Sequence, residues 1–120
     1  MQVAALCVAM TAACASAPGR LLAPKVVSAV ALAPYATLDE CMALDSGERI
    51  GYRFEAGQPV AFNVHFHDGN AVIMPVAIDS TTSESGDFTA DRKEVYCLTW
   101  EAGAEGSVLD YRINPWPRQP

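Results

Sequence analysis

Residues 59–67 alternate strictly between two kinds of side chain, in the order PVAFNVHFH. The apolar positions are Val60, Phe62, Val64 and Phe66. A side-chain period of two is typical of a β-strand that buries one face and exposes the other. Both histidines of the protein, His65 and His67, fall in the opposite row. We therefore expect a strand here, with the two imidazoles side by side on its exposed face.

Further segments show the same alternation or a high content of strand-forming residues. They are residues 25–33, 37–44, 49–55, 71–78, 87–90, 94–100 and 107–113. Residues 56–58 predict a short hairpin loop that pairs 49–55 with 59–67, and residues 79–86 predict a polar loop. Pro75 should limit its segment to a sheet edge or a bulge. About seven to eight short strands of this kind predict an all-β fold, an antiparallel β-sandwich of the jelly-roll type.

The beginning of the chain has the composition of an export signal. Residues 3–13 are uncharged and almost entirely small or apolar, and a bilayer span needs about 20 such residues. Two processing sites fit this segment: a small-x-small site at residues 15–17, or a lipobox-like TAAC whose Cys14 would be lipidated. A buried apolar helix is the alternative. We expect an exported bacterial protein, in the periplasm or as an outer-membrane lipoprotein.

A chain of 120 residues has room for one folded domain. The predicted parts are a signal (1–17), a tether with a first strand (18–36), the β-sandwich (37–114) and a Pro-rich tail (115–120). The net charge of −6 and the scattered Lys and Arg argue against nucleic acid. No polybasic patch for anionic lipid is visible, so we expect membrane contact only through a lipid anchor.

Cysteine usage fits the same compartment. Cys7 and Cys14 belong to the signal segment, which leaves Cys41 and Cys97 for the domain. A pair of cysteines in a small exported domain is most simply a disulfide. Two buried free thiols are the alternative.

The two histidines are the only side chains that suggest a metal site or a pH-sensitive site. On a strand, the Cα atoms of His65 and His67 should lie about 6.5–7 Å apart on one face. Two imidazoles could then bind one metal ion, with Asp68 and Met74 as the nearest further ligands in the sequence. A Met thioether would suit copper, and a carboxylate would suit zinc. The alternatives are ordinary polar residues on a solvent face, or a pH-sensitive recognition patch.

Other conspicuous side chains have structural interpretations. Tyr96 and Trp100 could line a ligand groove, but aromatic residues on a central strand usually fill the core. Trp116, in the Pro-rich tail, could fold back over a sheet edge or contact a partner. Asp39 and Glu40 are expected to face solvent.

Catalytic signatures are absent from the sequence. There is no Gly-x-Ser-x-Gly, no His-Glu-x-x-His and no phosphate-binding glycine loop. Serine, histidine and aspartate occur only as scattered residues. We therefore expect no enzymatic activity and no cofactor.

A set of residues along the body resembles a GOLD-type β-sandwich. The set is Cys41, Gly47, Tyr52-Arg53-Phe54-Glu55, Pro59-Val60, Tyr96-Cys97 and Tyr111. The lumenal domain of the p24 cargo-receptor family is the familiar example, and small exported bacterial proteins show a similar arrangement. The resemblance spans residues 37–113 and implies a compact jelly-roll-like sandwich with a Cys41–Cys97 bridge. It implies no catalytic residues, and it does not extend to the stalk, membrane helix and cytosolic tail of the cargo receptors.

Together these observations predict an exported, non-catalytic binding module of the cell envelope. Its partner would be a protein or a small ligand that the sequence does not identify. The alternative is a periplasmic protein that binds copper or zinc through His65 and His67.

Overall fold

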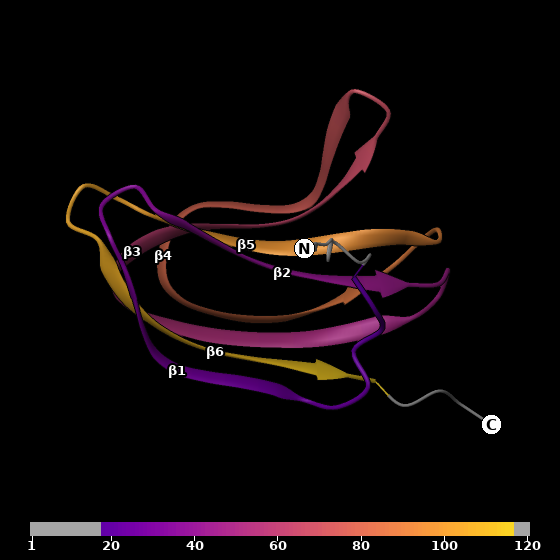
Figure 1. Ribbon diagram of the computed structural model, residues 1–120, viewed down its shortest axis with the longest axis horizontal. Coiled ribbons are helices and arrows are strands. Elements are labelled where there is room, and N and C mark those ends of the chain that lie inside the picture. Colours follow the sequence, from indigo (N-terminus) through magenta and orange to yellow (C-terminus); the bar gives the residue numbers. More distant parts are fainter. Residues whose placement is uncertain (1–17, 117–120) are drawn as a thin grey trace, which may run out of the picture.

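The computed structural model describes residues 18–116, in which β-strands are joined by turns. The strands are β1 (Lys25–Leu32), β2 (Thr37–Leu44), β3 (Arg49–Asp68), β4 (Ala71–Thr89), β5 (Glu94–Ala102) and β6 (Ser107–Pro115). They form one curled antiparallel sheet in the order β1-β6-β3-β5-β2, with β4 paired to β3 (Figure 1). The all-β antiparallel prediction is confirmed, and the curled sheet fits a β-sandwich-like fold.

Strand β3 is shared by the two halves of this sheet. Residues 50–56 of β3 pair with β6, whereas residues 60–65 pair with β5. Strand β4 pairs along the opposite edge of β3 almost throughout. We name β1, β6, residues 49–56 and the part of β4 beside them the β1–β6 wing. The β2–β5 wing consists of β2, β5, residues 60–65 and the part of β4 beside those.

The predicted hairpin at residues 56–58 is wrong, because β3 continues through these residues without reversing. The hydroxyl of Ser107 donates to the carbonyl of Gln58 at 2.8 Å and accepts from its N–H at 3.0 Å. Ser107 is only 8% exposed, so it satisfies the backbone at the point where β3 leaves β6 and joins β5. Even-numbered apolar residues from Ile50 to Phe66 stay buried on both sides of this point.

The polar loop predicted at residues 79–86 is also wrong. These residues belong to β4, a single strand of 19 residues whose described partner is β3 alone. The described chain therefore has six strands, because two expected loops are continuous strand. An edge strand is solvated on most sides and tolerates serine, threonine and glutamate, while β3 supplies its hydrogen bonds.

Pro75 lies at an irregularity in this edge strand, as expected. The register between β3 and β4 passes from Val64 opposite Val76 to Phe66 opposite Ile73. Met74 and Pro75 therefore oppose one residue of β3, which is the geometry of a β-bulge.

The inner faces of the two wings pack against each other around aromatic side chains. Trp100 and Tyr96 are both 0% exposed, so they are core residues. Trp100 of β5 stacks on Tyr111 of β6, with ring centroids 4.5 Å apart, and meets Phe54 edge-on at 5.8 Å. These contacts join β5 to strands of the other wing, and such aromatic pairs add about 0.5–1.5 kcal/mol each beyond area burial.

Glu40 also joins the wings, against the expectation that it faces solvent. Its carboxylate accepts a hydrogen bond from the Tyr111 hydroxyl and pairs with Lys25 Nζ at 2.7 Å. The side chain of Glu40 is only 14% exposed, because it shares the inward row of β2 with Met42. Burial, followed by the hydrogen bond to Glu40, raises the pKa of Tyr111 well above its usual value.

Several expected parts fall at the ends of the chain. The strand expected within residues 18–36 is present as β1, whereas the signal at 1–17, including Cys14, and residues 117–120 lie outside the described residues. Within residues 18–116, no helix has the length and apolar character needed to cross a membrane.

Replacing Glu40 by alanine should destabilise the protein by about 1–3 kcal/mol, because the partly buried Tyr111 hydroxyl and the Lys25 ammonium would lose their shared acceptor. Urea unfolding followed by tryptophan fluorescence measures the change. The control Glu105→Ala removes an exposed carboxylate from a turn and should change the free energy by less than about 0.5 kcal/mol. Equal unfolding curves for the two variants would contradict this role of Glu40.

Candidate functional site

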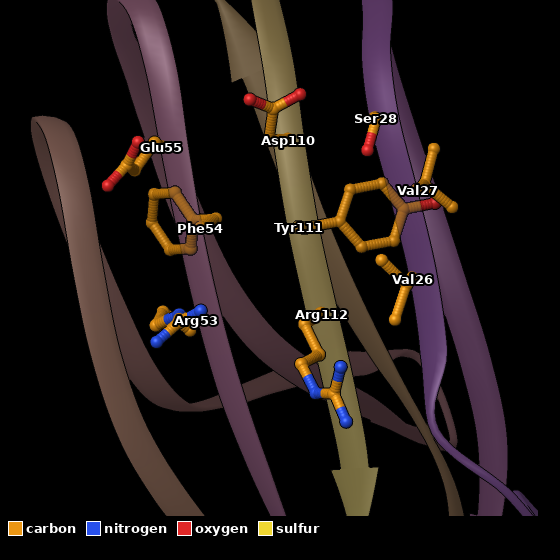
Figure 2. Close-up of a pocket in the computed structure, with 9 residues that line it drawn as sticks. All are labelled: Val26, Val27, Ser28, Arg53, Phe54, Glu55, Asp110, Tyr111 and Arg112. Atoms are coloured by element: carbon orange, nitrogen blue, oxygen red, sulfur yellow. The ribbon is translucent and has the colours of Figure 1, made fainter.

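The outer face of the β1–β6 wing carries two directly opposed pairs of like charges. Arg53 of β3 lies opposite Arg112 of β6, and Glu55 lies opposite Asp110. Directly opposed like charges destabilise a sheet unless other groups compensate them. Figure 2 shows the two arginines toward one end of a hollow and the two carboxylates toward the other.

This hollow has a volume of about 280 Å³ and opens to solvent. Its lining consists of Val26, Val27, Ser28, Arg53, Phe54, Glu55, Asp110, Tyr111 and Arg112. The residues come from three neighbouring strands, β1, β3 and β6, so hydrogen-bonded backbone holds the floor in position.

One of the two carboxylates has a structural role. Ser28 and Ala29 of β1 oppose Asp110 in a bulge, and Ala29 has a positive φ of 57°. The Asp110 carboxylate accepts a hydrogen bond from the Ala29 N–H at 2.6 Å. It thereby supports a backbone conformation that alanine rarely adopts.

Neither the Arg53 nor the Arg112 guanidinium group has an ion-pair partner within the described chain. Arg112 Nε donates to Asn114 Oδ1 at 2.8 Å, which leaves its two terminal nitrogens available. Within residues 18–116, the side chains of Arg53 and Glu55 form no hydrogen bond or ion pair. The outer face therefore presents two guanidinium groups without a carboxylate partner in the described chain.

Trp116 folds back over this face, one of the two outcomes expected for it. The Arg49 guanidinium lies 3.7 Å from the centroid of the indole, and the backbone N–H of Trp116 donates to the Arg49 carbonyl at 3.1 Å. A Cβ at Gly51 would lie 3.6 Å from Trp116 Nε1 and 3.3 Å from an Asp87 carboxylate oxygen. The indole therefore lies at ordinary contact distance from this glycine, and it is 47% exposed.

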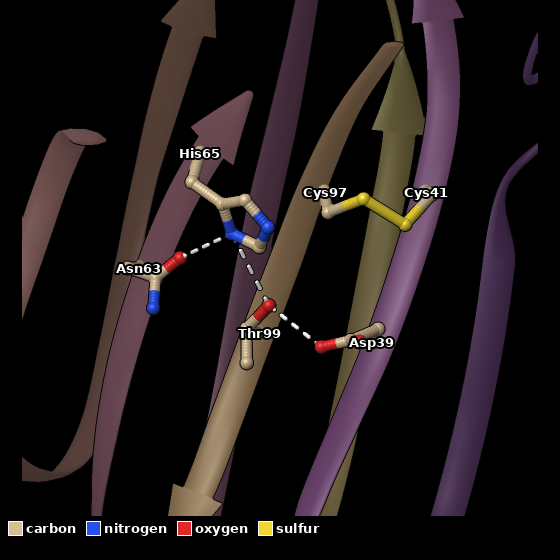
Figure 3. Close-up of a disulfide and its surroundings, with 6 residues drawn as sticks. All are labelled: Asp39, Cys41, Asn63, His65, Cys97 and Thr99. Carbon is tan, nitrogen blue, oxygen red and sulfur yellow. Dashed lines mark hydrogen bonds between the residues drawn. A yellow bond between two sulfur atoms is a disulfide. The ribbon is translucent and has the colours of Figure 1, made fainter. Parts of the chain in front are cut away.

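The outer face of the β2–β5 wing carries the disulfide and the histidines, and Figure 3 shows the disulfide with His65. Cys41 and Cys97 are directly opposed on β2 and β5, with Cα atoms 4.0 Å apart, and form the expected disulfide. The bridge closes a loop with a sequence separation of 56, for which the chain-entropy relation gives about 4 kcal/mol of stabilisation. His65 lies opposite Cys97 on the next strand.

Hydrogen bonds orient the ring of His65. Its Nδ1 lies 2.7 Å from Asn63 Oδ1 and 3.4 Å from Thr99 Oγ1, while the Thr99 hydroxyl donates to Asp39 at 2.7 Å. The Asn63 oxygen can only accept, and the Thr99 proton is directed to Asp39. The neutral ring therefore carries its proton on Nδ1, which leaves Nε2 with the free lone pair.

His67 lies beside His65 on the same outer row, as expected, with ring centroids 5.4 Å apart. The other two predicted ligands are less well placed. Asp68 pairs with Arg92 at 3.5 Å, and Met74, 51% exposed, lies in the bulge opposite His65. Residues 18–116 contain no group of three or more His, Cys, Asp or Glu side chains placed to hold a metal ion.

The environment of His65 opposes its protonation. Partial burial lowers its pKa below the usual histidine value, the charge of His67 lowers it further, and Asp39 acts weakly in the opposite direction. The ring is thus biased towards the neutral form in which Nε2 can accept a proton or bind a metal.

Sequence reasoning missed the partners that give these side chains their geometry. The alternation assigns Arg53 and Arg112 to outer faces separately, but it contains no signal that β3 pairs with β6 across 59 positions. Thr99 and Asp39 were likewise not connected to His65. These juxtapositions follow from strand order.

No known protein family matches this chain, and no curated protein matches it either. A fold class by itself does not determine a function, so the function must follow from the chemistry of the two outer faces.

Lowering the pH from about 7.5 to about 5 should destabilise the protein partly through His65. The folded-state pKa is lowered, so the unfolded chain binds more protons in this range. The stabilising contribution is complete above the unfolded pKa of about 6.5 and is lost as the pH falls through the folded pKa. Urea unfolding at a series of pH values measures the dependence.

The variant His65→Gln should show a weaker dependence on pH than the native protein. His67→Gln should retain most of it, because burial is the larger cause of the shift. Identical pH profiles for the native protein and His65→Gln would refute the assignment.

Proposed function

We propose that this protein is an exported, non-catalytic binding module of the bacterial cell envelope, with a β-sandwich of jelly-roll or GOLD-like type. The Cys41–Cys97 disulfide supports export, because disulfides persist in oxidising compartments. The apolar, uncharged residues 3–13 support it independently. The facing wings and their shared aromatic core support the sandwich type.

One observation carries the proposal of binding: Arg53 and Arg112 lie directly opposed on an open outer face, with no carboxylate partner in the described chain. Such a pair costs stability in isolation, and an anionic partner would offset that cost. The two arginines sit on hydrogen-bonded neighbouring strands, and such a preformed scaffold reduces the entropy lost on binding. The partner would be a protein or a small ligand of the envelope.

The surroundings of His65 support a non-catalytic role. A nucleophile of the serine or threonine type needs its hydroxyl proton directed to a base. The Thr99 hydroxyl donates instead to Asp39, and the nearby imidazole nitrogen is itself a donor. This arrangement orients the histidine and does not activate the threonine.

Export can be measured with a reporter enzyme that is active only outside the cytoplasm. Residues 1–36 fused to it should give activity in intact bacteria, and mass spectrometry of the full chain should find a mature N-terminus at Cys14 or after Ala17. Cys14→Ser should abolish lipidation if the lipoprotein form is the real one. An intact Met1 together with an inactive reporter would contradict export.

Binding can be measured by co-sedimentation of the mature protein with membrane, cell-wall and soluble periplasmic fractions. We expect retention by at least one fraction, reduced severalfold in the double variant Arg53→Gln/Arg112→Gln. Lys93→Gln, which removes an exposed cation from the turn before β5, is the matched control and should bind as the native protein does. No retention by any fraction would refute the binding module.

A second candidate function is supported by the tautomer of His65. We propose as the alternative that His65 and His67 bind copper or zinc, because Nδ1 of His65 is occupied by Asn63 and Nε2 is left available. Asp68 is engaged by Arg92, whereas Met74 lies in the bulge opposite His65, so copper fits the described side chains better than zinc.

Calorimetric titration with Cu(I), Cu(II) and Zn(II) tests this alternative. A metal protein should release heat on binding and gain melting temperature with excess metal, and both effects should vanish in His65→Gln/His67→Gln. Met74→Leu should weaken copper binding and leave zinc binding unchanged. Equal heats for the native protein and the double-histidine variant would eliminate this candidate.

A further inference from the structure

A second hollow adjoins the first on the outer face of the β1–β6 wing, and Arg53 and Arg112 belong to both. Its volume is about 510 Å³, within the range of about 300–1,000 Å³ that is common for small-molecule sites. Besides the two arginines, its polar lining includes Ser85, Asp87 and Asn114, and the Trp116 indole forms part of its wall.

The charge distribution distinguishes this hollow from the rest of the described surface. The chain carries a net charge of −6, and several of its cations are paired with carboxylates. The paired cations are Arg20, with Asp45 and Glu48; Lys25, with Glu40; and Arg92, with Asp68 and Glu94. The hollow thus combines two guanidinium groups without such partners and a single carboxylate, that of Asp87. A planar oxyanion matches a guanidinium fork in both charge and geometry.

Asp87 determines what kind of anion fits. A bare inorganic anion gains nothing from a neighbouring carboxylate, which would repel it. A ligand with hydroxyl groups as well can donate hydrogen bonds to Asp87, and it can exchange hydrogen bonds with Ser85 and Asn114. The lining therefore favours a hydroxylated anion.

The floor of the hollow accommodates such a ligand beside an aromatic ring. A Cβ at Gly86 would lie 2.7 Å from the Tyr52 hydroxyl, so only glycine fits beside this ring without displacing it. The Trp116 indole lies beside Gly51, and the Arg49 guanidinium stacks on it. Indole next to polar side chains suits the mixed apolar and hydroxylated surface of a sugar.

We propose that this hollow binds a sugar that carries an oxyanion. Arg53 and Arg112 hold the carboxylate or phosphate, and Asp87, with Ser85 and Asn114, receives the hydroxyl groups. The inference rests on the proposed function as a binding module and specifies its ligand class. Carboxylate and phosphate share the required chemistry, so the experiment includes both.

The test is a titration of the isotopically labelled mature protein by NMR. The probes are methyl glucuronide, glucose 6-phosphate and the neutral methyl glucoside. At least one acidic sugar should bind about tenfold more tightly than methyl glucoside and shift the resonances of β3 and β6 around the hollow. Binding of methyl glucuronide would identify a carboxylate as the recognised group, and binding of glucose 6-phosphate would identify a phosphate.

Variants separate the roles of the side chains. Arg53→Gln/Arg112→Gln should remove the preference for the acidic sugar, and Arg112→Lys should weaken it by losing the bidentate geometry. Lys93→Gln, which removes one positive charge elsewhere on the surface, should bind as the native protein does. Asp87→Asn should weaken sugar binding, while the binding of acetate or inorganic phosphate is unchanged or stronger.

Three results would overturn the inference: equal affinity for acidic and neutral sugars, equal affinity for acetate and the acidic sugars, or unchanged binding by the double-arginine variant. Failure of all the sugars, while an envelope fraction still retains the protein, would overturn this ligand class and leave the binding module intact. Absence of any retention as well would remove the proposed function itself.

Discussion

Both wings of the sheet depend on one long strand whose buried side never changes. The even-numbered apolar residues of β3 face inward from Ile50 to Phe66, although the strand changes its neighbour from β6 to β5 on the way. Ser107 supplies the hydrogen bonds that the backbone needs at this exchange. Because the buried residues are even-numbered both before and after the exposed residues 57–59, each wing places its apolar side chains against those of the other. The stack of Trp100 on Tyr111 is a direct result of this arrangement.

The polar chemistry of the molecule follows from the same constraint. Because the inner faces of the strands form the core, charged residues lie mainly on the outer faces and in the turns. Glu40 is the exception, because it lies between the wings and pairs with Lys25 there. On the β1–β6 wing, pairing of β3 with β6 leaves Arg53 and Arg112 side by side. On the β2–β5 wing, pairing of β3 with β5 gives His65 its Thr99 neighbour, while Asn63 of β3 itself occupies Nδ1 of the ring.

Particular elements mark how far the sequence alone predicts this structure. Alternation in residues 59–67 correctly predicts the buried row and the shared face of His65 and His67. The cysteine count correctly favours the Cys41–Cys97 bridge. Loop signals at 56–58 and 79–86 mislead, because a glycine or a run of serines permits a turn but does not require one. Strand β3 offers backbone hydrogen bonds along its whole length. The free energy gained by pairing with it outweighs the weak local preference of these residues for a turn.

By itself, the sequence determined which side chains lie on the inner and outer rows, because the period of two is a local property of an extended backbone. It also determined that only one cysteine pair is available within the described residues. Only the tertiary structure decided which strands, and therefore which rows of side chains, lie next to each other. The opposition of Arg53 to Arg112, the hydrogen bond of Tyr111 to Glu40 and the contact of His65 with Thr99 all join residues far apart in the chain. Such contacts depend on strand order and register, which arise from the cooperative packing of the whole sheet.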